Sequence, residues 1–262
     1  MNEVNKTLYI PLYGKTQISK KGIILHDPMA ERIWNEEAFP IKGKAKSKWL
    51  CYNMAMRARV FDDWTRQMLN QHADATVIHI GCGLDSRCLR VDVPETKWVD
   101  CDFPDVIAIR KKYYTESQHY FMKCLDATNQ DDLYSLPDAP CVILVLEGIS
   151  MYLSNQQLAN MFRILSEKYQ DVHVLMDVYT VFGAKASKYK NPVNDVGVST
   201  LYGVNSVSQL LEGTRISLAA EHSFTPDYLV NELTGFDKCF FRLMFTRKMY
   251  QKIYRLYELK AE

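Results

Sequence analysis

A Gly-x-Gly turn directly after a short apolar run is the feature that most constrains how this chain can fold. Residues 77–80 read VIHI, and Gly81 and Gly83 follow with one residue between them. An apolar run of this kind is typical of a buried parallel strand that ends in a ligand-facing turn. Because glycine has no Cβ, the backbone can adopt positive φ and approach a ligand, and the turn's N–H groups can face anionic groups. The pattern predicts a cofactor-binding loop.

The residues after the turn limit which cofactor it can hold. The dinucleotide fingerprint has a third glycine three residues after the second, where this chain has Ser86. A phosphate loop needs Gly-Lys-Ser/Thr, and no such sequence follows. Two interpretations remain: a dinucleotide loop with an altered third position, or the looser turn that holds the amino acid end of S-adenosylmethionine. The stretch favours the second.

Strand-like and helix-like segments alternate after the turn. The later apolar runs are at residues 96–99, 120–125, 141–146 and 172–176. Strands separated by helices need crossover connections, which give a parallel sheet with its ligands at the carboxyl ends of the strands. The alternation therefore predicts an α/β fold.

Carboxylates stand at the ends of four predicted strands, at Asp102, Asp126, Glu147 and Asp177. Asp102 lies about 20 residues after the glycine turn, where a carboxylate can accept hydrogen bonds from ribose hydroxyls. Asp126 could meet an adenine amino group. A single carboxylate at a strand end often only caps the next helix. Four carboxylates at the same end of the predicted strands favour a binding site.

The chain is predicted to form a single domain over residues 1–262. Residues 1–46 are broken by prolines and glycines but contain apolar residues, and a short helix could start at 27–34. Residues 47–71 have an amphipathic helical pattern. We expect 1–71 to form a lid or helical cover and 72–262 to form the core.

The C-terminal part has a weaker pattern. Residues 183–215 are expected to be helix and loop material covering the strand ends. Further predicted elements are a sixth strand at 216–222, a helix at 226–233 and a final strand at 249–259.

Composition excludes several classes of protein. With 32 basic and 31 acidic residues, the net charge is +1, so we expect no nucleic-acid partner. No apolar run approaches the ~20 residues that span a bilayer, and the N-terminus has no signal-like segment, so we expect a cytoplasmic protein without membrane contact. Seven cysteines without Cys-x-x-Cys spacing predict neither disulfides nor a zinc site, and no metal is expected. Cys82 is interpreted as a packing residue.

Five blocks carry a family resemblance: RARVFDDW at 57–64, VIHIGCGLDSR at 77–87, WVDCDFPDVI at 98–107, LDATN at 125–129 and LEGISMYLS at 146–154. The chain resembles the leucine carboxyl methyltransferase family, in particular its bacterial branch of polyketide O-methyltransferase-like proteins. The Gly-x-Gly-Leu-Asp-Ser-Arg motif followed by Asp-Phe-Pro is more specific than a glycine turn alone. The C-terminal part matches only in outline.

The resemblance implies the class I methyltransferase fold. This fold is a Rossmann-like, seven-stranded, mostly parallel sheet whose last strand runs antiparallel, with an N-terminal helical cover. The implied cofactor is S-adenosyl-L-methionine.

The resemblance also implies roles for individual residues. Arg59 would bind the cofactor's carboxylate, and Lys15 would match an N-terminal cofactor lysine. The turn beneath the cofactor would be formed by Gly81, Cys82 and Gly83. The remaining cofactor contacts would come from Asp102 and Phe103 at the ribose, Leu125 and Asp126 at the adenine, and Glu147 at the methionine amino group.

The implied reaction is O-methylation of a carboxylate or hydroxyl on a small, polyketide-like acceptor. Methyl transfer is an in-line displacement, so the acceptor oxygen must lie roughly 3 Å from the methyl carbon. A carboxylate is already ionised at neutral pH and needs no general base, whereas a phenol or alcohol needs one. No histidine stands in an obvious base position. Tyr152 and Arg87 are predicted to touch the acceptor.

Two alternatives stay open. One is an NAD-dependent oxidoreductase, against which Ser86 and the lack of a Tyr-x-x-x-Lys pair after the fourth strand argue. The other is a non-catalytic, cofactor-binding protein with a methyltransferase-like fold. For the methyltransferase, the expected partner is a small-molecule acceptor, and the oligomeric state is not predicted.

Overall fold

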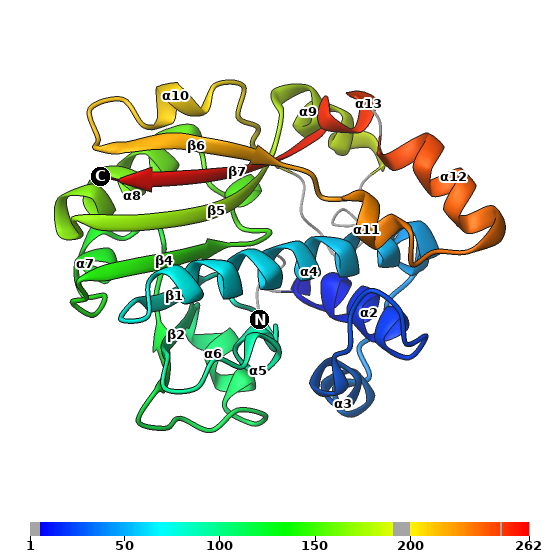
Figure 1. The fold of residues 1–262 in the computed structure, drawn as a ribbon, viewed down its shortest axis with the longest axis horizontal. Coiled ribbons are helices and arrows are strands. Elements are labelled where there is room, and N and C mark those ends of the chain that lie inside the picture. Colours follow the sequence, from blue (N-terminus) through cyan, green and yellow to red (C-terminus); the bar gives the residue numbers. More distant parts are fainter. Residues whose placement is uncertain (1–5, 191–199, 247, 262) are drawn as a thin grey trace.

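A seven-stranded sheet runs through the protein, seen here in a computed structural model that describes residues 6–190, 200–246 and 248–261 (Figure 1). The strands, in the spatial order β3-β2-β1-β4-β5-β7-β6, are β1 (Thr76–Ile80), β2 (Lys97–Asp102), β3 (Tyr120–Cys124), β4 (Cys141–Leu146), β5 (Asp171–Tyr179), β6 (Ile216–His222) and β7 (Tyr254–Ala261). β7 is antiparallel to both of its neighbours, and the other neighbouring strands pair in parallel. This topology confirms the predicted fold class.

The central strands are apolar because helices cover both of their faces. Every residue of β1 and β4 is buried. Along β4, Ile143 and Val145 pack into the cluster beneath the long helix α4 (Lys48–Gln71), while Val142 and Leu144 pack into the cluster beneath α8 (Asn155–Lys168). Continuous apolar runs are typical of parallel strands enclosed in this way.

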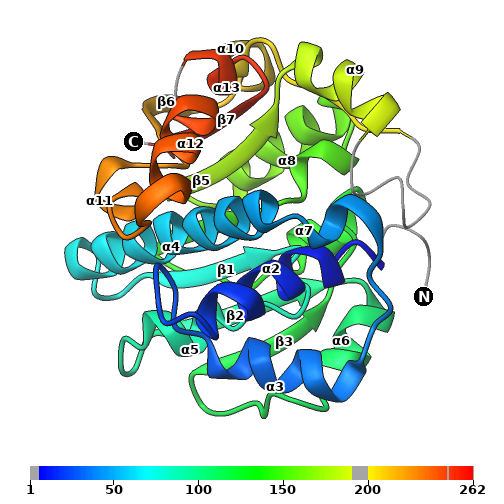
Figure 2. The same ribbon diagram turned by 90° about the vertical axis from the view of Figure 1, so that its right-hand side faces the viewer.

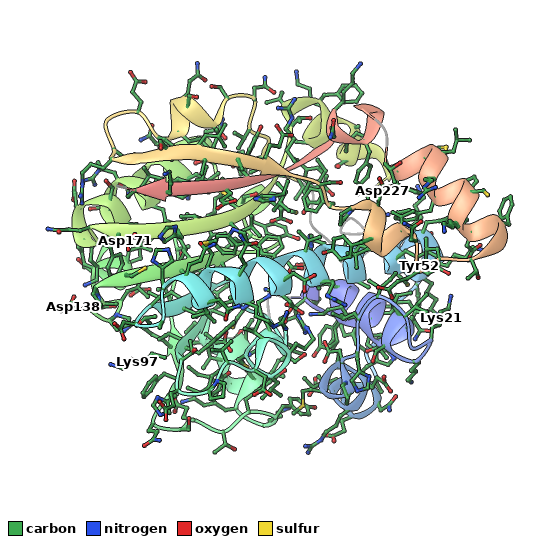
Figure 3. The ribbon with its side chains drawn as sticks, viewed as in Figure 1. Lys21, Tyr52, Lys97, Asp138, Asp171 and Asp227 are labelled. Atoms are coloured by element: carbon green, nitrogen blue, oxygen red, sulfur yellow. The ribbon has the colours of Figure 1, made fainter. Side chains whose placement is uncertain are left out.

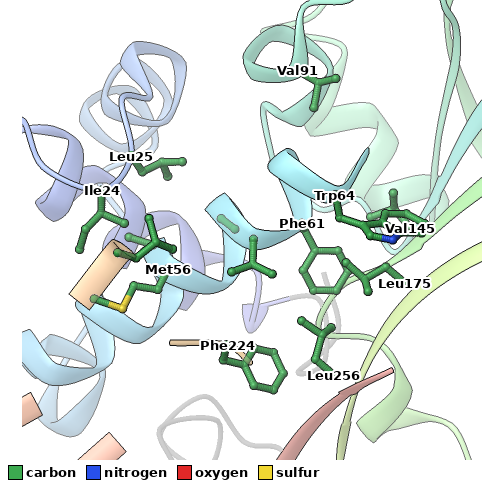
Figure 4. Close-up of a cluster of buried hydrophobic side chains, with 14 of the residues drawn as sticks. Ile24, Leu25, Met56, Phe61, Trp64, Val91, Val145, Leu175, Phe224 and Leu256 are labelled. Carbon is green, nitrogen blue, oxygen red and sulfur yellow. The ribbon is translucent and has the colours of Figure 1, made fainter. Parts of the chain in front are cut away.

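The helix α4 covers one face of the sheet, as its amphipathic pattern predicted. Figure 4 shows Phe61 and Trp64 of α4 against Val145 of β4 and Leu175 of β5. Each of these side chains is at most 5% exposed, so together they anchor α4 to the sheet.

The segment before α4 is more regular than predicted. Within residues 1–46, expected to be irregular, the structure has α2 (Tyr9–Ser19), α3 (Pro28–Glu37) and the 3₁₀ turn η1 (Gly43–Lys46). Figure 2 shows α2 running beside α4. The two helices approach closely at Gly14, where a Cβ would lie 2.9 Å from Met54 Cβ. α3 begins at an Asp27 cap, which accepts a hydrogen bond from Ala30 N at 2.9 Å. α3 begins where a short helix was expected, at 27–34; Gly22 and Pro40 lie between the elements, whereas Pro11 and Gly14 lie inside α2.

The connections between strands follow the predicted alternation. They contain α5 (Arg87–Val91), α6 (Pro104–Arg110), α7 (Gln130–Tyr134), the 3₁₀ turn η2 (Ser150–Tyr152) and α8. α8 begins with the capping box in which Ser154 and Gln157 bond each other's backbone N–H groups.

The C-terminal part differs from the prediction in three places. The final strand begins at Tyr254, after a short helix α13 (Lys248–Gln251), so the prediction of strand from residue 249 was wrong. The predicted helix at 226–233 is only α11 (Asp227–Val230). A longer helix, α12 (Gly235–Phe245), was not predicted. Helix propensity and hydrophobic periodicity predict secondary structure least well where several short helices lie between two strands.

The expected cover over the strand ends contains α9 (Val181–Lys190) and α10 (Val207–Leu210), and its residues 191–199 lie outside the described part. In the described part of the chain, no helix has both the length and the apolar content to cross a bilayer.

Candidate functional site

A cavity of about 560 Å³ lies at the carboxyl ends of the parallel strands. Its walls come from the segments after β1, β2, β3 and β4, from α2, α4 and α9, and from residues around the start of β7. Because β2 and β3 lie on one side of β1 and β4, and β5 and β7 on the other, the cavity has two ends. We call them the glycine end, around Gly81, Gly83 and Asp102, and the tyrosine end, around Tyr152, Tyr179, Tyr250 and Tyr254.

The glycine turn has the backbone that its sequence predicted. Gly81 and Gly83 have φ angles of +73° and +53°. The N–H groups of Gly81 and Cys82 both donate to Cys101 O, at 2.8 and 3.1 Å, which fixes the turn on the neighbouring strand β2. A Cβ on Gly81 would lie 2.9 Å from Ile149 Cδ1. The absence of that carbon keeps this wall of the cavity open.

Cys82 is 2% exposed and lies in the cluster that α2 and α3 form over the turn. Burial raises the pKa of its thiol, so the sulfur stays uncharged and acts in packing.

Asp102 has acceptor capacity left for a ligand. Its carboxylate accepts hydrogen bonds from Gly83 N at 2.7 Å and Phe103 N at 2.8 Å. Burial raises the pKa of Asp102, and these two N–H groups oppose the rise. An ionised carboxylate offers about four acceptor sites, so roughly two remain. Phe103 and Leu125 line the cavity beside it.

Asp126 lines the same end of the cavity, and its carboxylate accepts from Thr128 N and Thr128 Oγ1, both at 2.8 Å. It therefore caps a turn as well as facing the cavity. Capping is one of the two roles expected for a carboxylate at a strand end, and ligand binding is the other.

Arg57 and Glu147 form an ion pair on the cavity wall between the two ends. Arg57 Nε lies 2.8 Å from Glu147 Oε1, and Arg57 Nη1 lies 3.0 Å from Asp177 Oδ2 and 2.8 Å from the Tyr254 hydroxyl. Burial opposes ionisation of Glu147, but Arg57 and Arg87 outweigh it and lower the pKa to about 2. For Asp177, which is fully buried and outside the cavity lining, burial raises the pKa. The pair therefore offers a positive and a negative group side by side on the cavity wall.

The structure corrects the role given to Arg59. Its guanidinium binds Asp63 Oδ1 at 2.9 Å and Ile24 O at 3.0 Å, and Arg59 is absent from the cavity lining. Two residues along a helix correspond to about 200°, so Arg57 and Arg59 point to nearly opposite sides of α4. The arginine of α4 that reaches the cavity is Arg57.

The structure also corrects the role given to Arg87. Its side chain has no exposed surface, lies over the Phe61 ring at 5.2 Å, and is absent from the cavity lining. Its guanidinium binds Asp62 at 2.8 Å and also Glu147. Arg87 therefore positions Glu147 from behind and has no surface for an acceptor.

A buried ionic network joins α2 to the glycine turn. Lys15 Nζ lies 2.5 Å from Asp85 Oδ2, and Lys15 lines the cavity. Arg90 Nη2 donates to Asp85 Oδ1 at 3.0 Å, and burial of Asp85 is outweighed by these cations, so its pKa is lowered. Ser86, which stands where a dinucleotide loop has glycine, donates to Asp27 at 2.5 Å. The motif residues after the turn thus hold the helical cover in place.

The tyrosine end is mainly apolar and was largely missed from the sequence. Tyr152, predicted to contact the acceptor, lines it together with Tyr179, Tyr250 and Tyr254. Burial raises the pKa of Tyr152 to about 12 and also raises the pKa values of Tyr250 and Tyr254. These phenols are neutral at pH 7.

Of the twelve residues proposed for the site, ten line this cavity: Lys15, Gly81, Cys82, Gly83, Asp102, Phe103, Leu125, Asp126, Glu147 and Tyr152. Their individual contacts with a ligand stay predictions.

Solved structures with a similar fold define the class. Magnesium protoporphyrin IX methyltransferase from Synechocystis PCC 6803, solved with bound SAH, superposes with a TM-score of 0.54 at 11% identity, covering 90% of this chain and 93% of that one. An S-adenosylmethionine dependent methyltransferase from Mesorhizobium loti superposes with a TM-score of 0.50 at 10% identity, covering 76% and 100%. The fold is that of the class I methyltransferases.

The family model described as leucine carboxyl methyltransferase matches residues 15–166, more than half of the sequence. The chain belongs to this family.

Two curated relatives support the branch that the sequence resembled. The tetracenomycin polyketide synthesis O-methyltransferase TcmP of Streptomyces glaucescens is 33% identical over 158 residues, 60% of this chain and 58% of that protein. The S-adenosyl-L-methionine-dependent methyltransferase dpfgK of Gibberella zeae is 29% identical over 137 residues, 49% and 46% of the two chains. The matched region spans about half the length of these relatives.

Proposed function

We propose that this protein transfers a methyl group from S-adenosyl-L-methionine to an oxygen atom of a small-molecule acceptor. The observation that carries the proposal is one cavity in which the glycine turn and Asp102 stand at one end and a tyrosine-lined apolar space at the other. Family membership and the names of the two relatives support the same reaction. The family assignment also argues against the oxidoreductase alternative.

The residues at the glycine end fit the proposed cofactor. Gly81 and Gly83 provide the close backbone approach, and the free acceptor sites of Asp102 suit a pair of ribose hydroxyls. The amino acid end of the cofactor carries both an ammonium and a carboxylate. Glu147 and Arg57 offer both complementary charges within one ion pair, with Lys15 nearby on the cavity wall.

The chemistry at the tyrosine end favours an acceptor that arrives as an anion. The bound cofactor would supply an electrophilic methyl group, so this chain has to orient the acceptor oxygen and exclude water. The phenols of Tyr152, Tyr250 and Tyr254 have raised pKa values and do not serve as bases at neutral pH. The one histidine among the described residues that line the cavity is His79, which is only 1% exposed and lies within β1. It is therefore not placed to act as a general base. We therefore propose a carboxylate as the acceptor group.

A ligand-binding experiment tests the cofactor. S-adenosylhomocysteine at 100 times its Kd should add ~2.7 kcal/mol to the free energy of unfolding, a melting shift of several degrees. NAD at the same concentration should give none. A shift with NAD and none with S-adenosylhomocysteine would contradict the proposal.

A turnover experiment tests the acceptor. Methyl transfer should be measured over a library of aromatic and polyketide-like acids and of matched phenols and alcohols. We expect turnover with acids and a rate that stays level from pH 6 to 9. Turnover of phenols alone, rising with pH, would show that the acceptor class is wrong. Cofactor binding without any turnover would favour the non-catalytic alternative.

Tyr152 gives a check on acceptor placement. Tyr152→Phe removes a neutral hydroxyl from the tyrosine end and should raise KM for the acid severalfold while leaving the Kd of S-adenosylhomocysteine unchanged. A changed cofactor Kd with an unchanged KM would place Tyr152 at the cofactor.

A further inference from the structure

Four side chains with metal-ligating atoms gather at the edge of the sheet opposite the cavity. His72 follows the last residue of α4, Cys141 is the first residue of β4, and Asp171 and His173 lie at the start of β5. One ligand atom from each of the four lies within 4.8 Å of all the others. Figure 3 labels Asp171 at this edge, near one end of α4.

The fold explains why these residues meet. Cys141 and Asp171 are direct partners in the parallel pairing of β4 and β5, so their side chains share a face of the sheet. His173 lies two residues after Asp171, which keeps it on the same face. That face is the one covered by α4, because Cys141 belongs to the same apolar cluster as Phe61 and Trp64. The end of α4 then brings His72 to the group.

In the described part of the chain, the contacts within the group leave one ligand atom, His173 Nε2, without a hydrogen bond. Asp171 Oδ1 lies 3.0 Å from His173 Nε2, and Asp171 Oδ2 lies 3.8 Å from His72 Nδ1. Among the described residues, His173 Nε2 is buried and has Asp171 as its ionic neighbour but no hydrogen-bond partner. The two imidazole rings are 4.2 Å apart. A buried, unsatisfied nitrogen in a native structure requires an explanation.

We propose that His72, Cys141, Asp171 and His173 bind one zinc ion. Thiolate, imidazole and carboxylate are the donors that Zn²⁺ takes in protein sites, and four of them complete a tetrahedral structural site. Bond lengths of about 2.0–2.3 Å put tetrahedral ligand atoms roughly 3.3–3.8 Å apart. Since the present atoms all lie within 4.8 Å of one another, shifts of about 1 Å close the site.

The site would have a structural role. It would tie the end of α4 to the first residues of β4 and β5. Asp171 and the cavity residue Tyr179 are at opposite ends of β5, which corresponds to roughly 26 Å along the strand. The ion would therefore stabilise the packing of α4 without contacting the methyl-transfer site. The wide spacing of the ligands in sequence explains why cysteine spacing alone predicted no zinc site.

Metal titration of the 262-residue chain tests the proposal. Protein stripped with a chelator and dialysed would be titrated with Zn²⁺ alone, and in parallel with Co²⁺ as a spectroscopic substitute. We expect one equivalent to bind, a higher melting temperature, and a thiolate-to-cobalt charge-transfer band with tetrahedral d–d bands. Binding should also release protons, because the ligands must be deprotonated.

Variants assign the ligands. Cys141→Ser should abolish the charge-transfer band, and His72→Asn should weaken zinc binding at least tenfold. His72 is only half-buried, so its variant keeps the fold even if the buried Cys141→Ser destabilises it. Cys239→Ser and His26→Asn are matched controls at exposed positions and should bind as the unmodified chain does.

Two results would overturn the proposal. One is the absence of stoichiometric binding at micromolar Zn²⁺. The other is unchanged binding in His72→Asn together with loss in Cys239→Ser, which would place the metal on other side chains.

Discussion

Arg57 and Glu147 are separated by 90 residues in the chain, and their side chains meet at 2.8 Å on the cavity wall. Arg87 binds the second oxygen of Glu147 from the buried side. The carboxylate is therefore held between two guanidinium groups, one inside the cavity and one behind it. The first of these is available to a ligand, and the second fixes the geometry.

Replacing Arg57 should harm both stability and cofactor binding. Arg57→Met leaves Glu147 and Asp177 without this cation in a buried position, which typically costs 3–5 kcal/mol. We expect a lower denaturation midpoint in urea and at least tenfold weaker binding of S-adenosylhomocysteine. Arg59→Met is the matched control: its ion pair with Asp63 is partly exposed, and pairs of this kind contribute about 0–1 kcal/mol. Equal losses in the two variants would contradict the placement of Arg57.

Replacing Asp102 should weaken cofactor binding and also cost some stability, because one carboxylate oxygen accepts from Gly83 N and the other from Phe103 N. Asp102→Asn keeps the size of the side chain but removes its charge and one acceptor oxygen. A hydrogen bond to a charged group contributes about 1.5–3 kcal/mol, which is a roughly 10- to 150-fold rise in the Kd of S-adenosylhomocysteine by calorimetry. Asp131→Asn, at an exposed position of α7, should leave the Kd unchanged. An unchanged Kd in Asp102→Asn would show that the ribose lies elsewhere.

Gly81 and Gly22 both have positive φ, but only Gly81 lines the cavity. Comparing their alanine variants therefore distinguishes the effect of backbone strain from the effect of an added carbon at the cavity. Gly81→Ala adds a Cβ 2.9 Å from Ile149 Cδ1, whereas Gly22→Ala adds one with no atom within 4 Å. Both have φ near +70°, so each variant should lose about 1–2 kcal/mol of stability from the left-handed backbone. Only Gly81→Ala should also weaken cofactor binding, by tenfold or more. Equal cofactor affinity in the two variants would argue against the turn as a binding element.

Glu147 should contribute a pH-dependent part of the stability. Its pKa is lowered from 4.5 to about 2 in the folded protein, so its stabilisation is complete above pH 4.5 and is lost as the pH falls towards 2. A shift of this size corresponds to a free energy of unfolding on the order of 3 kcal/mol. Glu147→Gln should therefore be less stable than the unmodified chain at pH 7, and the difference should shrink between pH 4.5 and 2.

Urea denaturation at several pH values measures this difference. Glu212→Gln, at an exposed position, should show none. If the stability difference between the unmodified chain and Glu147→Gln grew as the pH fell, Glu147 would be neutral in the folded state, as burial alone would make it.

Much of the fold could be predicted from the sequence because its strongest patterns are local. Residues 141–146 match β4, since a short apolar run between polar residues has few other structures available. The capping box of Ser154 and Gln157 at the start of α8 is an equally local pattern. The short helix α2 was missed because Pro11 and Gly14 lie within it, whereas α3 begins where a short helix was expected.

The candidate site was predictable where short motifs place residues at the ends of adjacent strands, as at Gly81 and Gly83 after β1 and at Asp102 at the end of β2. It was not predictable where elements distant in sequence meet. Tyr254 reaches the cavity only because β7 returns antiparallel beside β5. Arg57 did carry a usable pattern, since it follows Leu50 by seven residues and Met54 by three, and both of these line the cavity. That helical spacing was a better guide than the family motif, which favoured Arg59.

The ion pair between Lys15 and Asp85 has a consequence for how the protein is made. The two residues are 70 positions apart, and Lys15 emerges from the ribosome first. Until β1 and the turn after it have been synthesised, a lysine that is 3% exposed in the finished protein has no carboxylate to meet. Since domains generally form as their chain becomes available, α2 can pack against α4 early, but its ionic contact with the turn forms only after β1 has been made. The cover over the cavity is therefore synthesised early and completed late.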